Sequence, residues 1–297
     1  MTTRVAVLAI KAAFDTAGVH GCLHALDLQS GAELGVHPDE PVVTASVFKF
    51  PVLVELFRQA EAGELDPAKQ ITVPADGRTP SLFGLAAMRD EVTMSLRDLA
   101  WLMISISDNA ATDVVCAHVG LDRVQAHLEA LGLSGTVIAD DCAGLFATII
   151  EDAGLESLED FPAVPDAALL ATLRAVDPLR TMHTTPRDMT RLLQLVWSDE
   201  AAPPKACAEV RRILSGQVWP HRLAAGFPED EYGTAGKTGT LPTLRNEVGV
   251  VEHKDGSQYA VAVFTRSSRI SVKNAVADAV IGQTARLAVN ALRARRR

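Results

Sequence analysis

The sequence predicts an α/β protein in which an antiparallel sheet, built from both ends of the chain, is combined with an inserted helical lobe. Three observations predict this arrangement. A segment with helical spacing precedes a hairpin near the start of the chain, and segments with helical spacing dominate the middle. Near the end, three strand-like segments are followed by an amphipathic helix. Strands from the two ends can therefore join in one sheet, with helices flanking it.

The first elements are a helix and a hairpin. Residues 3–17 have helical spacing, and the helix is expected to end near Gly18. Residues 19–28 are apolar and alternating, and residues 32–37 return after the turn at 29–31. Both hairpin strands are therefore expected to belong to the central sheet.

The middle of the chain is predicted to be helical. Residues 47–62 form a helix that is almost wholly apolar on one side, with Gly63 as its expected end. Other segments with helical spacing are 95–105, 109–118, 122–131, 167–175 and 186–198. We expect the helical lobe to span about residues 43–207 of a single catalytic domain, and the α/β lobe to combine about 1–42 with about 208–297. Sites in such folds tend to lie in the cleft between the lobes.

The last elements are three strands and a helix. The strands are expected at 233–240, 245–252 and 257–265, with residues 254–256 in the turn between the last two. An amphipathic helix is expected from about Asn274 to Arg295.

Composition limits the class of protein and of partner. The chain has 297 residues, of which 48 % are hydrophobic and 22 % are charged, which excludes wholesale disorder. Its net charge of −9 is the reverse of the basic excess typical of nucleic-acid-binding proteins, so we expect no nucleic-acid partner. The basic run at 293–297 is interpreted as a solvated helix end. The oligomeric state does not follow from the sequence.

The four cysteines give no metal or redox signal by their spacing. None lies within four residues of another, so no paired ligand motif is visible, and we expect neither a metal nor another cofactor. They are interpreted as small buried hydrophobic residues: Cys22, Cys116, Cys142 and Cys207.

No stretch of the sequence is long and apolar enough to span a bilayer. The apolar segment near the start is broken by Lys11 and Asp15, and no small-residue cleavage site follows it. We therefore predict no membrane partner and a cytoplasmic protein, or one whose export leader was removed.

Three short motifs carry candidate chemistry, and the first is Ser46-Val47-Phe48-Lys49. Positions i and i+3 share a helix face, so Ser46 and Lys49 can meet. A serine becomes a nucleophile when a base takes its proton, and a lysine can serve once burial or a second cation lowers its pKa. An isolated pair of this kind is more often an N-cap serine followed by an exposed lysine.

The second motif is Ser107-Asp108-Asn109, and the third is Lys237-Thr238-Gly239, followed by Thr240. The Ser107-Asp108-Asn109 motif can line a cleft, although each of its residues is also a common helix cap. In the other, a strand lysine can hold an anion and lower the pKa of a nearby lysine, and Gly239 lets a ligand approach the backbone closely. Its simpler interpretation is a solvent-facing lysine beside a threonine.

Taken together in this order, the motifs are far too rare to be chance, on the order of one chain in ten thousand. The combination Ser-x-x-Lys, Ser-Asp-Asn and Lys-Thr-Gly is the signature of class A β-lactamases and penicillin-binding proteins. The chain resembles this family over nearly its full length. Residues 94–99, Thr184-Thr185-Pro186 and Arg245-Asn246-Glu247 resemble further family segments.

The resemblance implies a fold and roles for these residues. The fold would be that of the β-lactamases and transpeptidases. Ser46 would be the acylated nucleophile, with Lys49 as its base or relay partner, and Ser107 would pass a proton to the leaving nitrogen. The backbone N–H groups of Ser46 and Thr240 would form the oxyanion hole. The residues implied to bind substrate are Asn109, which would bond a substrate amide, and Lys237, Thr238, Thr240 and Arg245, which would bind its carboxylate.

One family element is absent. The Glu-x-x-Leu-Asn loop, whose glutamate activates the water that removes the acyl group, does not occur. Its nearest equivalent is Asp152-Ala153-Gly154-Leu155-Glu156. Residues 139–180 look like an enlarged loop over the site that contains its own short helix, or alternatively a surface insertion without catalytic consequence. Whether a carboxylate within 140–166 performs deacylation is left open by the sequence.

The sequence therefore predicts a serine hydrolase that forms an acyl-enzyme at Ser46. Its substrate would be a β-lactam or another small amide or ester that bears a carboxylate, with weak β-lactamase turnover because the Glu-x-x-Leu-Asn loop is absent. Two alternatives remain: a cytoplasmic esterase or peptidase acting on a metabolite, and a catalytically slow relative that captures a ligand.

Overall fold

A computed structural model describes residues 2–162, 165–268 and 273–296. Two parts of the sequence predictions lie outside the described residues: Arg297 of the basic run and residues 163–164 of the enlarged loop. Among the described residues, none of the helices combines the length and apolar character that crossing a membrane requires.

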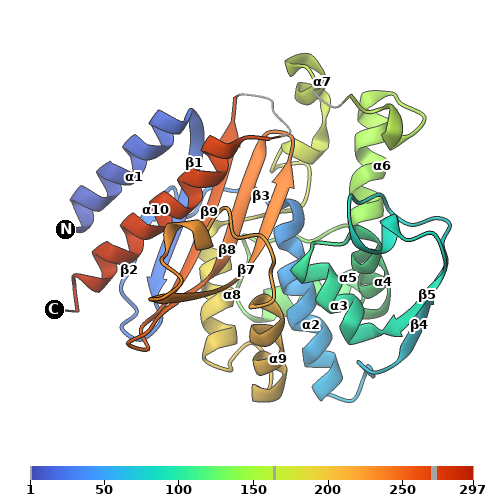
Figure 1. Cartoon of the computed structure of the whole chain (residues 1–297), viewed down its shortest axis with the longest axis horizontal. Coiled ribbons are helices and arrows are strands. Elements are labelled where there is room, and N and C mark those ends of the chain that lie inside the picture. The colour runs from blue at the N-terminus through green and yellow to red at the C-terminus, as the bar shows by residue number, and fades with distance from the viewer. Residues whose placement is uncertain (1, 163–164, 269–272, 297) are drawn as a thin grey trace.

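The centre of the molecule is a five-stranded sheet in the order β2-β1-β9-β8-β7, in which all neighbouring strands are antiparallel (Figure 1). It joins strands from both ends of the chain, as the sequence predicts, because β1 pairs with β9 along its whole length. The strands are β1 (Val19–Asp27), β2 (Glu33–Val36), β7 (Tyr232–Leu241), β8 (Leu244–His253) and β9 (Gln258–Ser267).

Two helices cover one face of the sheet and lie side by side, α1 (Thr3–Ala17) and α10 (Ala275–Arg293) (Figure 1). Helix α1 ends as predicted at Gly18, whose φ of 66° is the left-handed conformation that glycine favours at helix ends. A Cβ on Gly21 of β1 would lie 2.3 Å from the ring of Phe14, so glycine allows α1 to approach the sheet closely. Buried apolar residues of α1, of α10 and of the sheet face that they cover form one hydrophobic core.

The other helices share the second core, which also includes apolar side chains from the opposite face of the sheet. Thr185 begins α8 as the family resemblance implies, because its side chain accepts a hydrogen bond from the Asp188 N–H and Pro186 follows at the first helical position. These helices are α2 (Lys49–Glu61), α3 (Leu96–Ser105), α4 (Asn109–Val119), α5 (Leu121–Ala130), α6 (Cys142–Ala153), α7 (Ala167–Thr172), α8 (Pro186–Trp197) and α9 (Pro204–Leu214).

Short elements connect the longer ones. Two small antiparallel pairs, β3 with β6 and β4 with β5, lie outside the central sheet. The short strands are β3 (Val42–Val43), β4 (Gln70–Val73), β5 (Val92–Ser95) and β6 (His183–Thr184). The 3₁₀ turns are η1 (Ala45–Phe48), η2 (Gly84–Ala87), η3 (Leu158–Asp160), η4 (Arg174–Val176) and η5 (Ala224–Gly226).

The predicted α/β fold, with a sheet from both chain ends and flanking helices, is confirmed. Three details differ from the predictions. The helix expected over 167–175 ends at Thr172, and the chain then turns through η4. Helix α9 was not predicted, and the expected boundary between lobes at residue 207 falls inside it. The helix expected from residue 47 begins as η1, which carries Ser46, and becomes α-helical at Lys49. The division into two lobes stays a prediction.

Candidate active site

The segment that carries Ser46 is held against the sheet. Ala45 has a φ of 46°, a left-handed conformation that is unusual for a residue with a side chain and sharply redirects the chain before Ser46. The Asn246 amide on β8 donates hydrogen bonds to the Val43 carbonyl at 2.9 Å and the Thr44 carbonyl at 3.3 Å. Ser46 is therefore presented on a fixed turn at the start of a buried helix.

Gly239 on β7 allows this packing. A Cβ at Gly239 would lie 2.6 Å from the Thr44 carbonyl oxygen and 3.3 Å from the Ala45 Cβ. The structure thus gives the glycine of the third motif a specific role, because only a residue without a side chain lets the strand lie so close to the turn before Ser46.

Lys49 is fully buried and is bonded to the second motif. Its Nζ donates to the Ser107 carbonyl at 2.8 Å, to Ser107 Oγ at 3.3 Å and to Asn109 Oδ1 at 2.9 Å. Within the described part of the chain, the hydrogen bonds of Lys49 therefore go to Ser107 and Asn109 rather than to Ser46. A proton can pass between Lys49 and Ser107 without rearrangement.

Lys237 reaches the same hydroxyl from the sheet. Its Nζ donates to Ser107 Oγ at 3.0 Å and to the Thr238 carbonyl at 2.9 Å. The side chain is fully buried, and this burial, with the charges of Lys49 and Arg222 close by, lowers the pKa of Lys237 well below its usual value. The structure thus brings one residue of each motif together: Lys49, Ser107 and Lys237.

The middle residue of the second motif is structural. Asp108 is fully buried and caps α4 by accepting a hydrogen bond from the Ala111 N–H. Its second carboxylate oxygen accepts from the Leu85 N–H at 2.6 Å, which ties residues 80–87 to the motif. The backbone of Ser107, with a φ of 62°, is consequently fixed in a left-handed conformation that directs its hydroxyl between the two lysines.

A cleft with a volume of about 520 Å³ opens beside this cluster. Four of the predicted site residues line it with Ser46: Ser107, Asn109, Thr238 and Thr240. The remaining lining residues are Pro80, Ser81, Leu82, Phe83, Ile106, Trp219, His221 and Arg222. The cleft therefore combines the motif residues with an apolar and aromatic rim.

Thr240 lies on β7, the edge strand of the sheet. The Thr238 N–H turns away from β8, since it donates to the Gln217 side chain at 2.7 Å. Backbone groups alternate in direction along a strand, so the N–H of Thr240, two residues further, has the same outward direction. This is the direction required of an oxyanion-hole donor.

Arg222 is a site residue that the sequence did not indicate. It is buried and lines the cleft, and it donates to the Thr240 hydroxyl at 2.8 Å and the Gly239 carbonyl at 3.0 Å. Asp278 on α10 orients it through a 2.7 Å ion pair. Its place in the sequence, in the connection between α9 and η5, gave no signal of this position.

The structure places Arg245, the predicted substrate-binding arginine, on β8 opposite Thr240. Its guanidinium donates to the Leu241 and Leu244 carbonyls, and its Nε lies 3.6 Å from Asp278. The guanidinium among the residues lining the Ser46 cleft is that of Arg222.

No carboxylate is present among the described residues that line the cleft or that bond to Lys49. Cys142, the first residue of α6, lies there instead, with its Sγ 3.5 Å from Asn109 Oδ1. Burial raises the pKa of the Cys142 thiol to about 11, against the opposing effect of the Lys49 charge. The thiol is therefore neutral near pH 7.

Two acidic residues of the enlarged loop, Asp141 and Asp152, have other structural partners. Asp152, the nearest sequence equivalent of the missing glutamate, accepts hydrogen bonds from the Arg174 backbone N–H at 2.6 Å and its guanidinium at 2.8 Å. Asp141 caps α6. The loop contains the helices α6 and α7, of which α7 lies within the helix predicted at 167–175.

Comparison with known proteins gives consistent matches. The model of a family described as "Beta-lactamase enzyme family" matches residues 6–292. The chain is 32 % identical over 296 residues to a protein of Streptomyces cacaoi named Beta-lactamase regulatory protein BlaB, covering 93 % of this chain and 94 % of that protein.

Solved structures match over almost the whole chain. A β-lactamase from Sphaerobacter thermophilus is 25 % identical with a TM-score of 0.78, and the match covers 97 % of each chain. The structure of PBP-A is 22 % identical with a TM-score of 0.78, covering 98 % of this chain and 97 % of that one, and it supports the fold alone.

Proposed function

The chain belongs to the β-lactamase enzyme family, as its resemblance to class A β-lactamases and penicillin-binding proteins predicted, and from this premise we propose that it forms an acyl-enzyme at Ser46. The family and fold support a hydrolase of the β-lactamase type. The proposed substrate is a β-lactam, or a related amide or ester that bears a carboxylate. The observation that carries the proposal is the Ser107 hydroxyl, bonded to both Lys49 and Lys237 beside the cleft that Ser46 lines.

In the proposed reaction, Ser46 Oγ attacks the substrate carbonyl carbon, and the proton of its hydroxyl passes to the Lys49 and Ser107 pair. The C–N or C–O bond of the substrate then breaks, and Ser107 delivers a proton to the leaving atom. The N–H groups of Ser46 and Thr240 stabilise the negative charge on the carbonyl oxygen, a contribution of roughly 3–4 kcal/mol per donor.

The substrate carboxylate is proposed to bind where Lys237, Thr238 and Arg222 meet at the edge strand. Lys237 and Arg222 supply positive charge from buried positions, which strengthens their attraction for an anion. Asn109, whose amide donates to the Pro80 carbonyl at 2.8 Å and which lines the cleft, is proposed to bond a substrate amide as well. Arg245, which was also predicted to bind the carboxylate, lies on the neighbouring strand β8.

An apolar pocket of about 380 Å³ next to Thr240 favours a substrate with an apolar group beside its scissile bond. Its lining comes from the enlarged loop and the end of β7, including Phe146, Ile149, Leu173 and Leu241. Burying an apolar side chain there would contribute about 25 cal/mol per Å² of surface removed from water.

Intact mass spectrometry tests the acylation directly. Wild-type protein incubated with benzylpenicillin should gain the mass of one penicillin, and Ser46→Ala should gain none. Ser81→Ala, which removes another serine of the same cleft, should still be acylated. An adduct on Ser46→Ala, or no adduct and no turnover of lactams and esters by the wild type, would refute the proposal.

A second candidate function is ligand capture with slow release. It is favoured by the absence of a carboxylate among the described residues beside Lys49, and the Streptomyces cacaoi relative is named a regulatory protein. The lifetime of the adduct separates the candidates. A penicillin adduct that persists for hours indicates capture, whereas rapid nitrocefin turnover indicates an ordinary β-lactamase. Faster turnover of simple esters or peptides than of lactams would favour the third alternative, an esterase or peptidase.

A further inference from the structure

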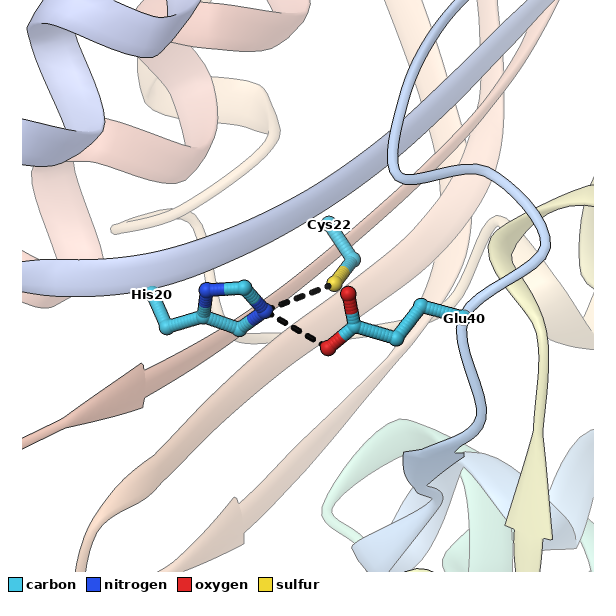
Figure 2. Close-up of side chains that lie close together, drawn as sticks. All are labelled: His20, Cys22 and Glu40. Atoms are coloured by element: carbon cyan, nitrogen blue, oxygen red, sulfur yellow. Dashed lines mark hydrogen bonds and ion pairs between the residues drawn. The ribbon is translucent and has the colours of Figure 1, made fainter.

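Three potential metal ligands converge on the side of β1 that faces away from α1. His20 and Cys22 are two residues apart on the strand, so their side chains leave the same face. Glu40 reaches them from the connection between β2 and β3. Figure 2 shows the three side chains pointing toward one another, with dashed lines from His20 Nε2 to the Cys22 sulfur and to a Glu40 carboxylate oxygen.

The distances between the three side chains are those of a site that needs only a small adjustment to hold a metal. Their ligand atoms all lie within 4.8 Å of one another. His20 Nε2 is 3.6 Å from Cys22 Sγ, which equals the separation of about 3.6 Å expected for a nitrogen and a sulfur bound to tetrahedral Zn²⁺. His20 Nε2 is 2.6 Å from Glu40 Oε1, so the carboxylate must retreat by about 0.7 Å. Glu40 can do so because its side chain is 39 % exposed.

Burial and charge also suit a divalent ion. The Cys22 sulfur is buried and adjoins a small cavity of about 70 Å³, whereas the His20 side chain is 52 % exposed and provides access from solvent. A thiolate and a carboxylate together neutralise a 2+ charge, so the bound site would carry no net charge in its half-buried position. One donor each of nitrogen, sulfur and oxygen is a combination that Zn²⁺ accepts.

The neighbouring histidine on the same face provides a contrast. His24 is buried and already bonded, with its Nδ1 2.6 Å from the Thr190 hydroxyl and its Nε2 3.2 Å from the Arg187 guanidinium. A carboxylate oxygen of Glu33 also lies 3.3 Å from His24 Nε2, but Glu33 is paired with Arg187, a cation that repels a metal. At His20 the partners are a thiol and a carboxylate, both of which are metal ligands.

We propose that His20 Nε2, Cys22 Sγ and a Glu40 carboxylate oxygen bind one Zn²⁺. This site is separate from the Ser46 cleft and independent of the function proposed for that cleft. Binding forms Zn–N, Zn–S and Zn–O bonds and breaks the S–H bond of Cys22, whose proton leaves to solvent. Water occupies the fourth position, or His37 does after a side-chain rotation, since its Nδ1 lies 3.7 Å from the other Glu40 oxygen.

Titration with Co²⁺ tests the site, because a thiolate bound to tetrahedral Co²⁺ gives a charge-transfer absorption that ammonium, carboxylate and imidazole groups do not. The wild-type protein should bind one Co²⁺ per chain and show this absorption together with intense visible bands. Added Zn²⁺ should abolish both. Cys22→Ser should lose the charge-transfer band, and His20→Ala should weaken Co²⁺ binding by about tenfold or more.

The matched control is Cys207→Ser, which removes another buried cysteine that lies on α9 and should leave the titration unchanged. Thermal unfolding with and without Zn²⁺ provides a second measurement, since a ligand that binds only the folded protein raises its Tm. That rise should be present in the wild type and in Cys207→Ser and absent in Cys22→Ser. The proposal is overturned if the wild type shows no thiolate band, or if Cys22→Ser or His20→Ala binds Co²⁺ as the wild type does.

Discussion

The ammonium nitrogen of Lys237 lies 3.0 Å from the hydroxyl oxygen of Ser107, although the two residues are far apart in the sequence. Lys49 donates to the same oxygen at 3.3 Å. A hydroxyl that accepts from two lysines has its own hydrogen free to donate, which is what a group delivering a proton to a leaving atom needs.

Removing this hydroxyl should slow acylation. Ser107→Gly suits the left-handed backbone at this position, so it should fold normally while losing only the side chain. We expect the acylation rate constant to fall by about 10²–10⁴-fold, the range for loss of a general acid or base. A time course of adduct formation with benzylpenicillin measures it. Wild-type rates in a normally folded Ser107→Gly would remove Ser107 from the proposed mechanism.

Lys237 should reduce stability at neutral pH. Its pKa in the folded protein lies well below the usual 10.5 of the unfolded chain, because the charged form is buried beside Lys49 and Arg222. Between these two pKa values the unfolded chain binds more protons, so stability falls as the pH falls: the cost of burying Lys237 is absent above about pH 10.5 and is complete below the folded pKa.

Lys237→Met removes the buried ionisable group at similar length. Urea unfolding should show this variant to be more stable than the wild type at pH 7, with the difference shrinking toward pH 10. Its acylation rate should fall, because the substrate carboxylate loses a cation. A Lys237→Met protein that is less stable than the wild type at pH 7 would show that the burial cost is not the dominant effect.

Cys142 stands where a carboxylate could assist deacylation. Cys142→Asp places an acid beside Lys49 and Asn109, near the neutral thiol's present position. We expect the penicillin adduct to decay about tenfold faster or more, since a positioned base activates water. The decay of purified acyl-enzyme, followed by intact mass, measures this. Cys142→Ser is the control and should keep the wild-type lifetime; equal lifetimes for the Asp and wild-type adducts would contradict the prediction.

Asp152 should have no part in deacylation, because the structure assigns it to Arg174. Asp152→Asn should leave the adduct lifetime unchanged while making the enlarged loop more open to limited proteolysis. A longer-lived adduct in Asp152→Asn with an unchanged proteolysis pattern would instead show that Asp152 takes part in deacylation.

Asn246 should matter for both stability and rate. Its amide holds the Val43 and Thr44 carbonyls just before Ser46, and the side chain is 1 % exposed. Asn246→Ala removes both bonds, at a cost of about 1 kcal/mol or more each. Urea unfolding should show the loss, and acylation should slow because the turn that presents Ser46 is less fixed. Unchanged stability and rate would show that β8 does not hold this turn.

The elements with regular apolar spacing could be predicted from the sequence. Residues 3–17 form α1 over the predicted span, and the three C-terminal strands lie within one or two residues of expectation. Helix α9 was missed although its buried residues recur at helical spacing: Ala206, Cys207, Val210, Ile213 and Leu214. The small pairs of β3 with β6 and of β4 with β5 are too short to give a periodic signal.

The positions of site residues depended on contacts that sequence spacing does not encode. Arg222 reaches the cleft because the sheet brings its connection against Thr240 and Asn246. The spacing of the cysteines does not indicate the convergence of His20 and Cys22 with Glu40, because the neighbours of Cys22 are a histidine and a glutamate. The signal that could have found it is the His20-x-Cys22 pair on a strand, whose alternation puts both side chains on one face.

The pairing of β1 with β9 also bears on how the protein is made. During synthesis, β1 and β2 can form their hairpin early. The other edge of β1 cannot pair with β9 until most of the chain has left the ribosome. Ser46 and Ser107 are made long before Lys237, which lies on a strand that joins the sheet late. A nascent chain therefore carries Ser107 without Lys237, and the contact between them forms only when the sheet closes.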